Sequence, residues 1–195
     1  MVELLWYTPY EILMKAIRVS HASLDKLDTE GNTLGSEDLK LLQKIIKKHH
    51  DSVLEHVVYS FYITDISRAL LQELVRHRFV SFTVQSTRYT LAKKLRNNAT
   101  SELCIKVDDL IDNHNKAVID FIKQHTDYPN DYLKYLIPEA FKTELVMTTN
   151  ARELAHIIEL RSQPNVLWEF QELVAALQQI VYDVHPELWG LLKWR

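Results

Sequence analysis

The stretch VVYSFYIT, residues 57–64, decides the fold class of this 195-residue chain. Apolar and polar side chains alternate along it, which predicts a strand. The side chains expected to point inward are those of Val57, Tyr59, Phe61 and Ile63. A helical pattern follows at once, with Asp65 as its expected N-cap and the basic residues 76–78 at its end. The alternating pattern of a strand, followed directly by the pattern of a helix, predicts a fold in which strands and helices are mixed.

Upstream of this strand the sequence predicts two helices. The first begins at Thr8-Pro9-Tyr10-Glu11, where Thr8 is expected to cap and Glu11 to complete a capping box. Residues 28–35 are polar and contain two glycines, so they predict a surface loop. A second helix is expected from Ser36 to about His50, followed by a capping box at residues 52–55.

Downstream, the pattern changes period several times. The elements expected are a strand or extended loop over 79–85, a helix over 107–124, a short helix between Pro129 and Pro138, a weak strand over 141–149, a helix from Asn150 to Leu160 and a long final helix from Asn165. These elements show no regular strand-helix-strand repeat. We therefore expect an α+β fold with a mixed or antiparallel sheet, built as one domain over residues 1–195.

Composition limits the possible functions. Hydrophobic residues make up 47% and charged residues 25%, as in ordinary globular proteins, and the formal charge of −3 predicts neither a nucleic-acid nor a membrane partner. The three glycines, Gly31, Gly35 and Gly190, fit the spacing of neither the dinucleotide fingerprint nor the Walker A loop, so phosphates would be bound by side chains and helix ends. One cysteine excludes an internal disulfide, and the start of the chain does not resemble a signal peptide. These features favour the cytoplasm.

The segment RHRFVSFTVQSTRY, residues 76–89, is the most unusual in the chain because it combines three arginines, a histidine and several hydroxyl groups. Basic residues often only cap a helix end, but Ser86 and Arg88 extend this cluster well beyond it. Guanidinium groups keep their charge at every working pH and bind phosphate through paired N–H donors. The segment therefore predicts a ligand with several phosphates.

This segment also resembles the signature of the flavin-dependent thymidylate synthases, Arg-His-Arg followed after seven residues by Ser86. The family pattern continues with Arg-Tyr, found here at residues 88–89. Further matches are His50 and Glu55-His56 upstream, and Asn150-Ala151-Arg152, Leu160-Arg161 and Trp168-Glu169 downstream. The matching blocks stand in the family's order and cover residues 50–171.

The resemblance implies a homotetrameric enzyme with its active sites between subunits. It implies FAD as cofactor, dUMP as substrate, methylenetetrahydrofolate as carbon donor, NADPH as reductant and dTMP as product. The residues that match flavin-contacting positions are His50, Ser52, Arg76, His77, Arg78, Asn150, Arg152 and His156. The local role of Asn150 as a helix N-cap is equally compatible with its sequence and can coexist with flavin contact.

The resemblance also assigns substrate positions. Arg76 is expected near the nucleotide, residues 85–88 (Gln85, Ser86, Thr87 and Arg88) match the loop that holds the dUMP phosphate, and Lys134 stands where an arginine usually does the same work. Arg161 matches the arginine proposed to favour the ionised uracil ring, which makes it the expected catalytic residue. Glu73 and Val84 occupy substrate positions where glutamine and glutamate are usual, while His156 replaces an asparagine and Asn165 a histidine.

Other readings remain open. Cys104 has no nearby histidine or arginine cluster, so we expect a packed side chain and a reaction without a cysteine nucleophile. No metal is expected, since His49, His50 and His56 lack the spacing and partners of a zinc site. Two rival functions are a flavin oxidoreductase with another substrate and a nucleic-acid module with residues 65–78 as recognition helix.

Overall fold

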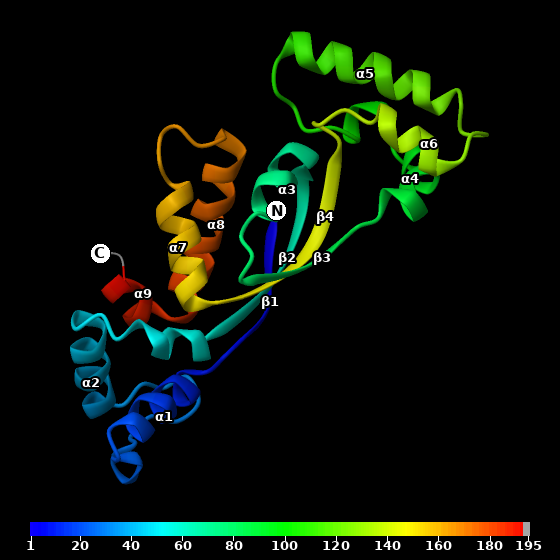
Figure 1. Cartoon of the computed structure of the whole chain (residues 1–195). Coiled ribbons are helices and arrows are strands. Elements are labelled where there is room, and N and C mark those ends of the chain that lie inside the picture. Colours follow the sequence, from blue (N-terminus) through cyan, green and yellow to red (C-terminus); the bar gives the residue numbers. More distant parts are fainter. Residues whose placement is uncertain (193–195) are drawn as a thin grey trace. The chain divides into compact units, whose positions relative to one another are not determined.

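The computed structural model describes residues 1–192 and contains one four-stranded sheet (Figure 1). Its strands are β1 (Val2–Tyr7), β2 (Val58–Ser67), β3 (Val80–Val84) and β4 (Lys142–Asn150), in the order β1-β2-β4-β3. Backbone hydrogen bonds at both ends show that β1 and β2 run antiparallel, as do β2 and β4. The predicted α+β class is confirmed.

Helices make up most of the remaining chain. The α-helices are α1 (Tyr10–Ser20), α2 (Ser36–Lys47), α3 (Arg68–Leu74), α4 (Thr87–Asn97), α5 (Asp109–Lys123), α6 (Asn130–Leu133), α7 (Ala151–Arg161), α8 (Trp168–Val184) and α9 (Pro186–Leu192). Short 3₁₀ helices are η1 (Leu24–Lys26), η2 (Asp51–His56), η3 (Thr100–Glu102) and η4 (Lys134–Leu136). Among the helices of residues 1–192, none has the length and apolar character that crossing a membrane requires.

The chain divides into two compact units. Unit 1 comprises residues 1, 62–76 and 82–146, and unit 2 comprises residues 2–61, 77–81 and 147–192 within the described chain. Strands β2, β3 and β4 each contribute residues to both units. The prediction of one domain over the whole chain stays a prediction.

Strand β2 shows the predicted alternation but ends later than expected. Tyr59, Phe61 and Ile63 are buried, as the pattern predicts. The strand continues through Asp65 to Ser67, whose Oγ accepts a hydrogen bond of 2.9 Å from the backbone N–H of Leu70. Ser67 therefore caps α3, and the prediction of Asp65 as N-cap is wrong. A better-placed hydroxyl two residues later outweighs the local preference of aspartate.

The predicted cap of the first helix is also wrong. Helix α1 begins at Tyr10 after Pro9, without a side-chain cap. The Thr8 hydroxyl instead accepts from the N–H of Val58, 3.0 Å away, while the Glu11 carboxylate accepts from the N–H of Gly31 at 2.9 Å. The Thr8 hydroxyl and the Glu11 carboxylate therefore bind backbone groups that are distant in sequence and do not cap α1.

Three elements were not predicted from the sequence: β1, α4 and α9. The α4 helix matters most for function, because residues expected to form a phosphate-binding loop lie at its start. Ser86 takes the N-cap position, and Thr87 and Arg88 form the first turn. The last predicted helix begins at Trp168 rather than Asn165, and its continuation breaks at His185 before α9.

The core of unit 1 is apolar. Leu91 and Leu95 of α4 pack in one cluster with Ile119 and Ile122 of α5. Cys104 packs against this cluster, and burial raises the pKa of its thiol to about 11. The expected packed role of this cysteine is confirmed, and its thiol stays protonated near neutral pH.

Unit 2 contains a buried group of polar side chains around His185. The His185 side chain is 1% exposed, and its Nδ1 lies 2.7 Å from the hydroxyl of Tyr59, which also accepts a hydrogen bond of 2.9 Å from Trp189 Nε1. Burial lowers the pKa of His185 to about 4, so the ring is neutral at pH 7.

Candidate active site

Arg161 is held in unit 2 by contacts on two sides. It is the last residue of α7, and its guanidinium carbon lies 4.7 Å from the ring centroid of Phe170 on α8. Its Nε–H donates a hydrogen bond of 3.1 Å to Nε2 of His77, which belongs to the segment between α3 and β3. A stacked and hydrogen-bonded guanidinium has lost much of its rotamer freedom before any ligand arrives.

The contacts of His77 favour one tautomer of its neutral ring. An arginine Nε–H can only donate, so Nε2 of His77 accepts and the ring proton belongs on Nδ1. Nδ1 faces Oε1 of Glu153 at 3.6 Å, and the His77 side chain is only 6% exposed. Glu153 is fixed in turn, because its backbone N–H donates to Oδ1 of Asn150 at 2.9 Å at the start of α7. The predicted helix cap of Asn150 is thus confirmed.

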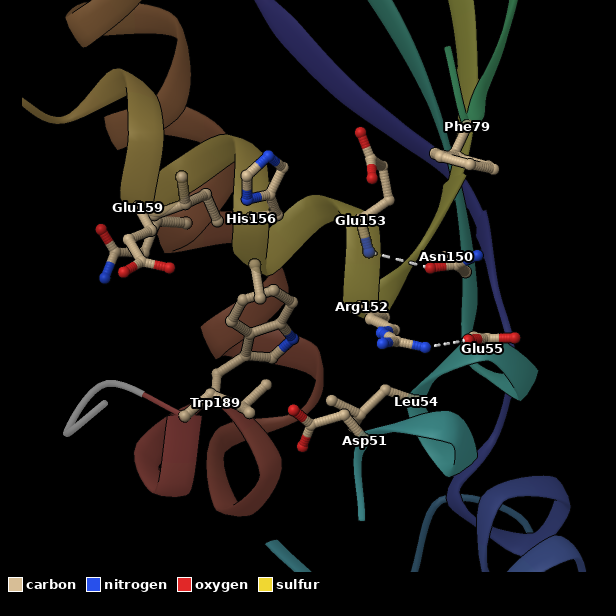
Figure 2. Close-up of a pocket in the computed structure, with 14 residues that line it drawn as sticks. Asp51, Leu54, Glu55, Phe79, Asn150, Arg152, Glu153, His156, Glu159 and Trp189 are labelled. Atoms are coloured by element: carbon tan, nitrogen blue, oxygen red, sulfur yellow. Dashed lines mark hydrogen bonds and ion pairs between the residues drawn. The ribbon is translucent and has the colours of Figure 1, made fainter. Parts of the chain in front are cut away.

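A cavity of about 760 Å³ opens in unit 2 beside α7, within the size range of small-molecule sites (Figure 2). Three residues predicted to contact flavin line it: Asn150, Arg152 and His156. Figure 2 shows Arg152 pointing from α7 to Glu55, with which it forms an ion pair. Apolar side chains complete the wall, among them Leu54, Phe79, Ile158, Trp189 and Leu192.

The other predicted flavin residues do not line this cavity. His50, Ser52 and Arg78 belong to unit 2 and are exposed, whereas His77 is buried against Arg161. Arg76 is exposed and is the last residue of its segment of unit 1. The cavity wall instead contains four carboxylates, from Asp51, Glu55, Glu153 and Glu159.

Unit 1 brings together the predicted phosphate-binding residues. Arg88 Nε lies 3.1 Å from Oδ2 of Asp131, and Lys134 Nζ lies 3.6 Å from Oδ1 of the same carboxylate. Helix α4 carries Arg88 and contacts both α6, which carries Asp131, and η4, which carries Lys134. The first backbone N–H groups of α4 have no partner within the helix, and Ser86 forms no side-chain cap. Two cations and a helix N-terminus therefore meet at one exposed position.

Gln85 is held by two charged neighbours. Its Nε2 donates to the carboxylate of Glu144 on β4, while its Oε1 accepts from Lys94 Nζ at 3.1 Å. Tyr62 donates to the other oxygen of Glu144. A carboxylate thus reaches this segment from β4, although Val84 stands where glutamate was expected. Glu73 lies half-buried on α3.

Sequence reasoning missed the acidic partners of the basic site residues: Glu55, Asp131, Glu144 and Glu153. Glu153 follows Asn150 by three residues, which is the spacing of a capping box and a usable signal. The acids paired with Arg88 and Arg152 lie far from them in sequence, and only the fold brings them together.

The two basic centres suit different chemistry. An arginine that is stacked on an aromatic ring, as Arg161 is, can stabilise negative charge as it develops on a bound group. Exposed cations beside a helix N-terminus bind an anion that is already formed, such as a phosphate monoester.

Comparison with known proteins identifies the family. The family model described as "Thymidylate synthase complementing protein" matches residues 3–187. Flavin-dependent thymidylate synthases from Campylobacter jejuni and Wolinella succinogenes are 38% and 37% identical, covering 94% and 97% of this chain and 93% and 97% of their own. The crystal structure of thymidylate synthase X from Helicobacter pylori with FAD and dUMP has a TM-score of 0.87 and 32% identity, with 99% of each chain covered. The chain belongs to the flavin-dependent thymidylate synthase family.

Proposed function

We propose that this protein converts dUMP to dTMP, with FAD as bound cofactor, methylenetetrahydrofolate as carbon donor and NADPH as reductant. The observation that carries the proposal is the meeting of Arg88 and Lys134 at one carboxylate, beside the N-terminus of α4. A nucleoside monophosphate offers the dianion that would replace Asp131 as the partner of both cations. Family membership and the FAD and dUMP named for the Helicobacter pylori structure support the same substrate and cofactor.

Arg161 is the proposed catalytic residue. Transfer of hydride and of a methylene group both change the charge on the uracil ring, and a fixed guanidinium directed at the ring would lower that barrier without a proton transfer. Bound FAD would supply hydride chemistry, while the protein orients the substrate and stabilises charge. The thiol of Cys104, with its pKa raised to about 11, supports a reaction that uses no cysteine nucleophile.

The residues of unit 2 fit a flavin by their chemistry. The apolar side chains of Phe79 and Trp189 line one cavity with the polar side chains of Arg152 and His156, which suits an aromatic ring with polar edges. Arg78 and Arg152 are exposed guanidinium groups of the kind that bind a pyrophosphate. His50, Ser52 and Asn150 would complete the set, and Arg76 would serve both flavin and nucleotide.

Charge supports a site shared between subunits. The cavity of one chain contains four carboxylates and one arginine, whereas the pyrophosphate of FAD brings two further negative charges. Cations from a second copy of the chain would offset this excess. We therefore propose the homotetramer with active sites between subunits, and the mass of the protein in solution tests it; an active monomer would contradict it.

The decisive experiment for the function is an omission series. Purified protein with FAD is mixed with dUMP, methylenetetrahydrofolate and NADPH, and dTMP is measured by chromatography. We expect dTMP only when all three are present. NADPH oxidation without dTMP in the complete mixture would favour the rival flavin oxidoreductase, and salt-sensitive DNA binding in place of dUMP binding would favour the nucleic-acid module.

A further inference from the structure

We infer that Glu153 and His77 are positioning residues that act as one unit to fix Arg161 for catalysis. This inference rests on the proposed function, because it concerns the guanidinium to which we assign the reaction. Glu153 faces Nδ1 of His77, and Nε2 of His77 accepts from Nε of Arg161. The three side chains form a line from the first turn of α7 to its last residue.

The chemistry of this line selects one tautomer of His77. With the proton on Nδ1, the ring presents its N–H to the Glu153 carboxylate and its lone pair to the Arg161 N–H. The other tautomer would place two N–H groups against each other at Arg161 and a lone pair against the carboxylate. Both ring nitrogens therefore favour the same tautomer, and through it Glu153 acts on Arg161 by way of His77.

A protonated His77 would end this arrangement. The imidazolium ring has no acceptor, so the hydrogen bond to Arg161 would be lost and two cations would face each other. Among the groups that face His77 are Glu153 and Arg161, with the His156 ring at a centroid distance of 6.5 Å and the Phe170 ring at 6.0 Å. His77 must accordingly stay neutral while Arg161 works.

Burial supports a positioning role. The His77 side chain is 6% exposed and the Glu153 side chain 13%, so ligands have little access to the imidazole. The imidazole of the signature histidine is turned toward Arg161, and its expected contact with flavin stays a prediction. The backbone of Glu153 is also held by the Asn150 cap, so its carboxylate can hold His77, and through it Arg161, in one position.

The test uses amide variants that separate the two ring nitrogens. In His77→Gln the side-chain oxygen reaches the place of Nε2 and still accepts from Arg161, whereas in His77→Asn the shorter amide reaches only the place of Nδ1. Single-turnover dTMP formation is measured with pre-reduced enzyme at saturating dUMP and folate, together with flavin content and the dUMP Kd. Glu172→Ala, an exposed residue of α8, is the matched control for Glu153→Ala.

We expect His77→Asn to lower the single-turnover rate by roughly ten- to a hundred-fold, since a small misplacement of a catalytic group has effects of this size. His77→Gln should stay within about threefold of wild type, and the dUMP Kd and flavin content should not change. Glu153→Ala should slow turnover about tenfold, yet leave the His77→Asn rate unchanged when the two are combined. Glu172→Ala should behave as wild type.

Three results would overturn the inference: a normal rate in His77→Asn, equal losses in the Asn and Gln variants, or additive effects of Glu153→Ala and His77→Asn. A measurement on the wild-type holoenzyme needs no variant to fold: histidine ¹⁵N NMR should show the His77 proton on Nδ1, and a proton on Nε2 would equally overturn the inference. Failure of the proposed function is separate. It would appear as no dTMP from wild type, or as normal turnover in Arg161→Ala.

Discussion

Arg161 in unit 2 and Arg88 in unit 1 are both proposed site arginines, but their surroundings differ. Arg161 stacks on Phe170 and donates to a buried histidine, whereas the Arg88 side chain is 60% exposed and pairs with a carboxylate that is itself 44% exposed. A guanidinium fixed before the reaction spends no free energy on reorganisation when charge develops. An exposed pair exchanges partners easily. On this contrast we propose that Arg161 stabilises charge as it develops during the reaction, and that Arg88 binds the phosphate that the substrate already carries.

The largest predicted effect is that of replacing Arg161, the proposed catalytic arginine of the two. Arg161→Ala is expected to lower single-turnover dTMP formation by roughly a hundred- to a thousand-fold, because a preorganised partner of the developing charge is lost. Arg161→Lys should recover little, since an ammonium group cannot both stack and donate through a planar fork. NADPH-driven reduction of the flavin, followed by absorbance, should largely survive and serves as the control.

The next effect concerns the pH dependence of stability. It is expected from the buried His185 of unit 2, whereas the core cluster of unit 1 is apolar. The pKa of His185 falls from 6.5 to about 4 on burial, so the unfolded chain binds the proton more tightly. The protein therefore keeps its full stability against unfolding above pH 6.5. As the pH falls toward 4, protonation of His185 in the unfolded chain lowers the free energy of unfolding by about 3 kcal/mol. Urea unfolding at a series of pH values, followed by tryptophan fluorescence, measures this change.

His185→Gln separates this group from the carboxylates that also titrate at low pH. The amide keeps a hydrogen-bonding group beside Tyr59 but does not titrate, so its stability should decline less steeply between pH 7 and pH 4. Parallel declines in wild type and variant would show that His185 does not contribute.

A smaller effect is expected on the binding side. Arg88→Ala or Lys134→Ala should weaken dUMP binding by roughly ten- to a hundred-fold, which corresponds to about 1.5–3 kcal/mol for one charge-assisted contact. Equilibrium titration with dUMP measures the change. Asp131→Asn is the matched control. It removes the carboxylate that pairs with both cations, so dUMP binding should be unchanged or slightly tighter. An unchanged Kd in Arg88→Ala would remove α4 from the substrate site.

The smallest effect is expected at Cys104. Because burial raises the pKa of its thiol to about 11, little thiolate exists at pH 8, and iodoacetamide should react slowly. Cys104→Ala should keep the wild-type turnover, apart from a modest loss of stability in the unit 1 core. Rapid inactivation by iodoacetamide that Cys104→Ala abolishes would contradict this view.

The strongest periodic signals in the sequence predicted the fold well. The alternation in β2 and the cap at Asn150 depend on neighbouring residues, and both are confirmed. The cap at Thr8 failed because a distant backbone group, the N–H of Val58, takes its hydroxyl, whereas the cap at Asp65 failed because the nearby hydroxyl of Ser67 caps α3 instead. Helix α4 was missed because its mixed polar start resembles a loop and its apolar face, Leu91 and Leu95, is short.

The sequence was enough to name the basic residues of the candidate site but not their acidic partners. Arginines and histidines in ordered blocks carry the family resemblance, so Arg88 and Arg161 could be named from the sequence. The acids that neutralise or orient them, such as Asp131, are distant in the chain or lie in ordinary helix positions. Only packing decides which acid meets which base, and that information is absent from local patterns.

The central claim is the division of labour between the two arginines, and one paired measurement tests it most directly. The single-turnover rate at saturating dUMP and the dUMP Kd are determined for Arg161→Ala and Arg88→Ala side by side. The predicted result is a crossed pattern: a slow rate with near-normal Kd for Arg161→Ala, and a weakened Kd with a near-normal saturated rate for Arg88→Ala. Equal changes of both quantities in both variants would contradict it.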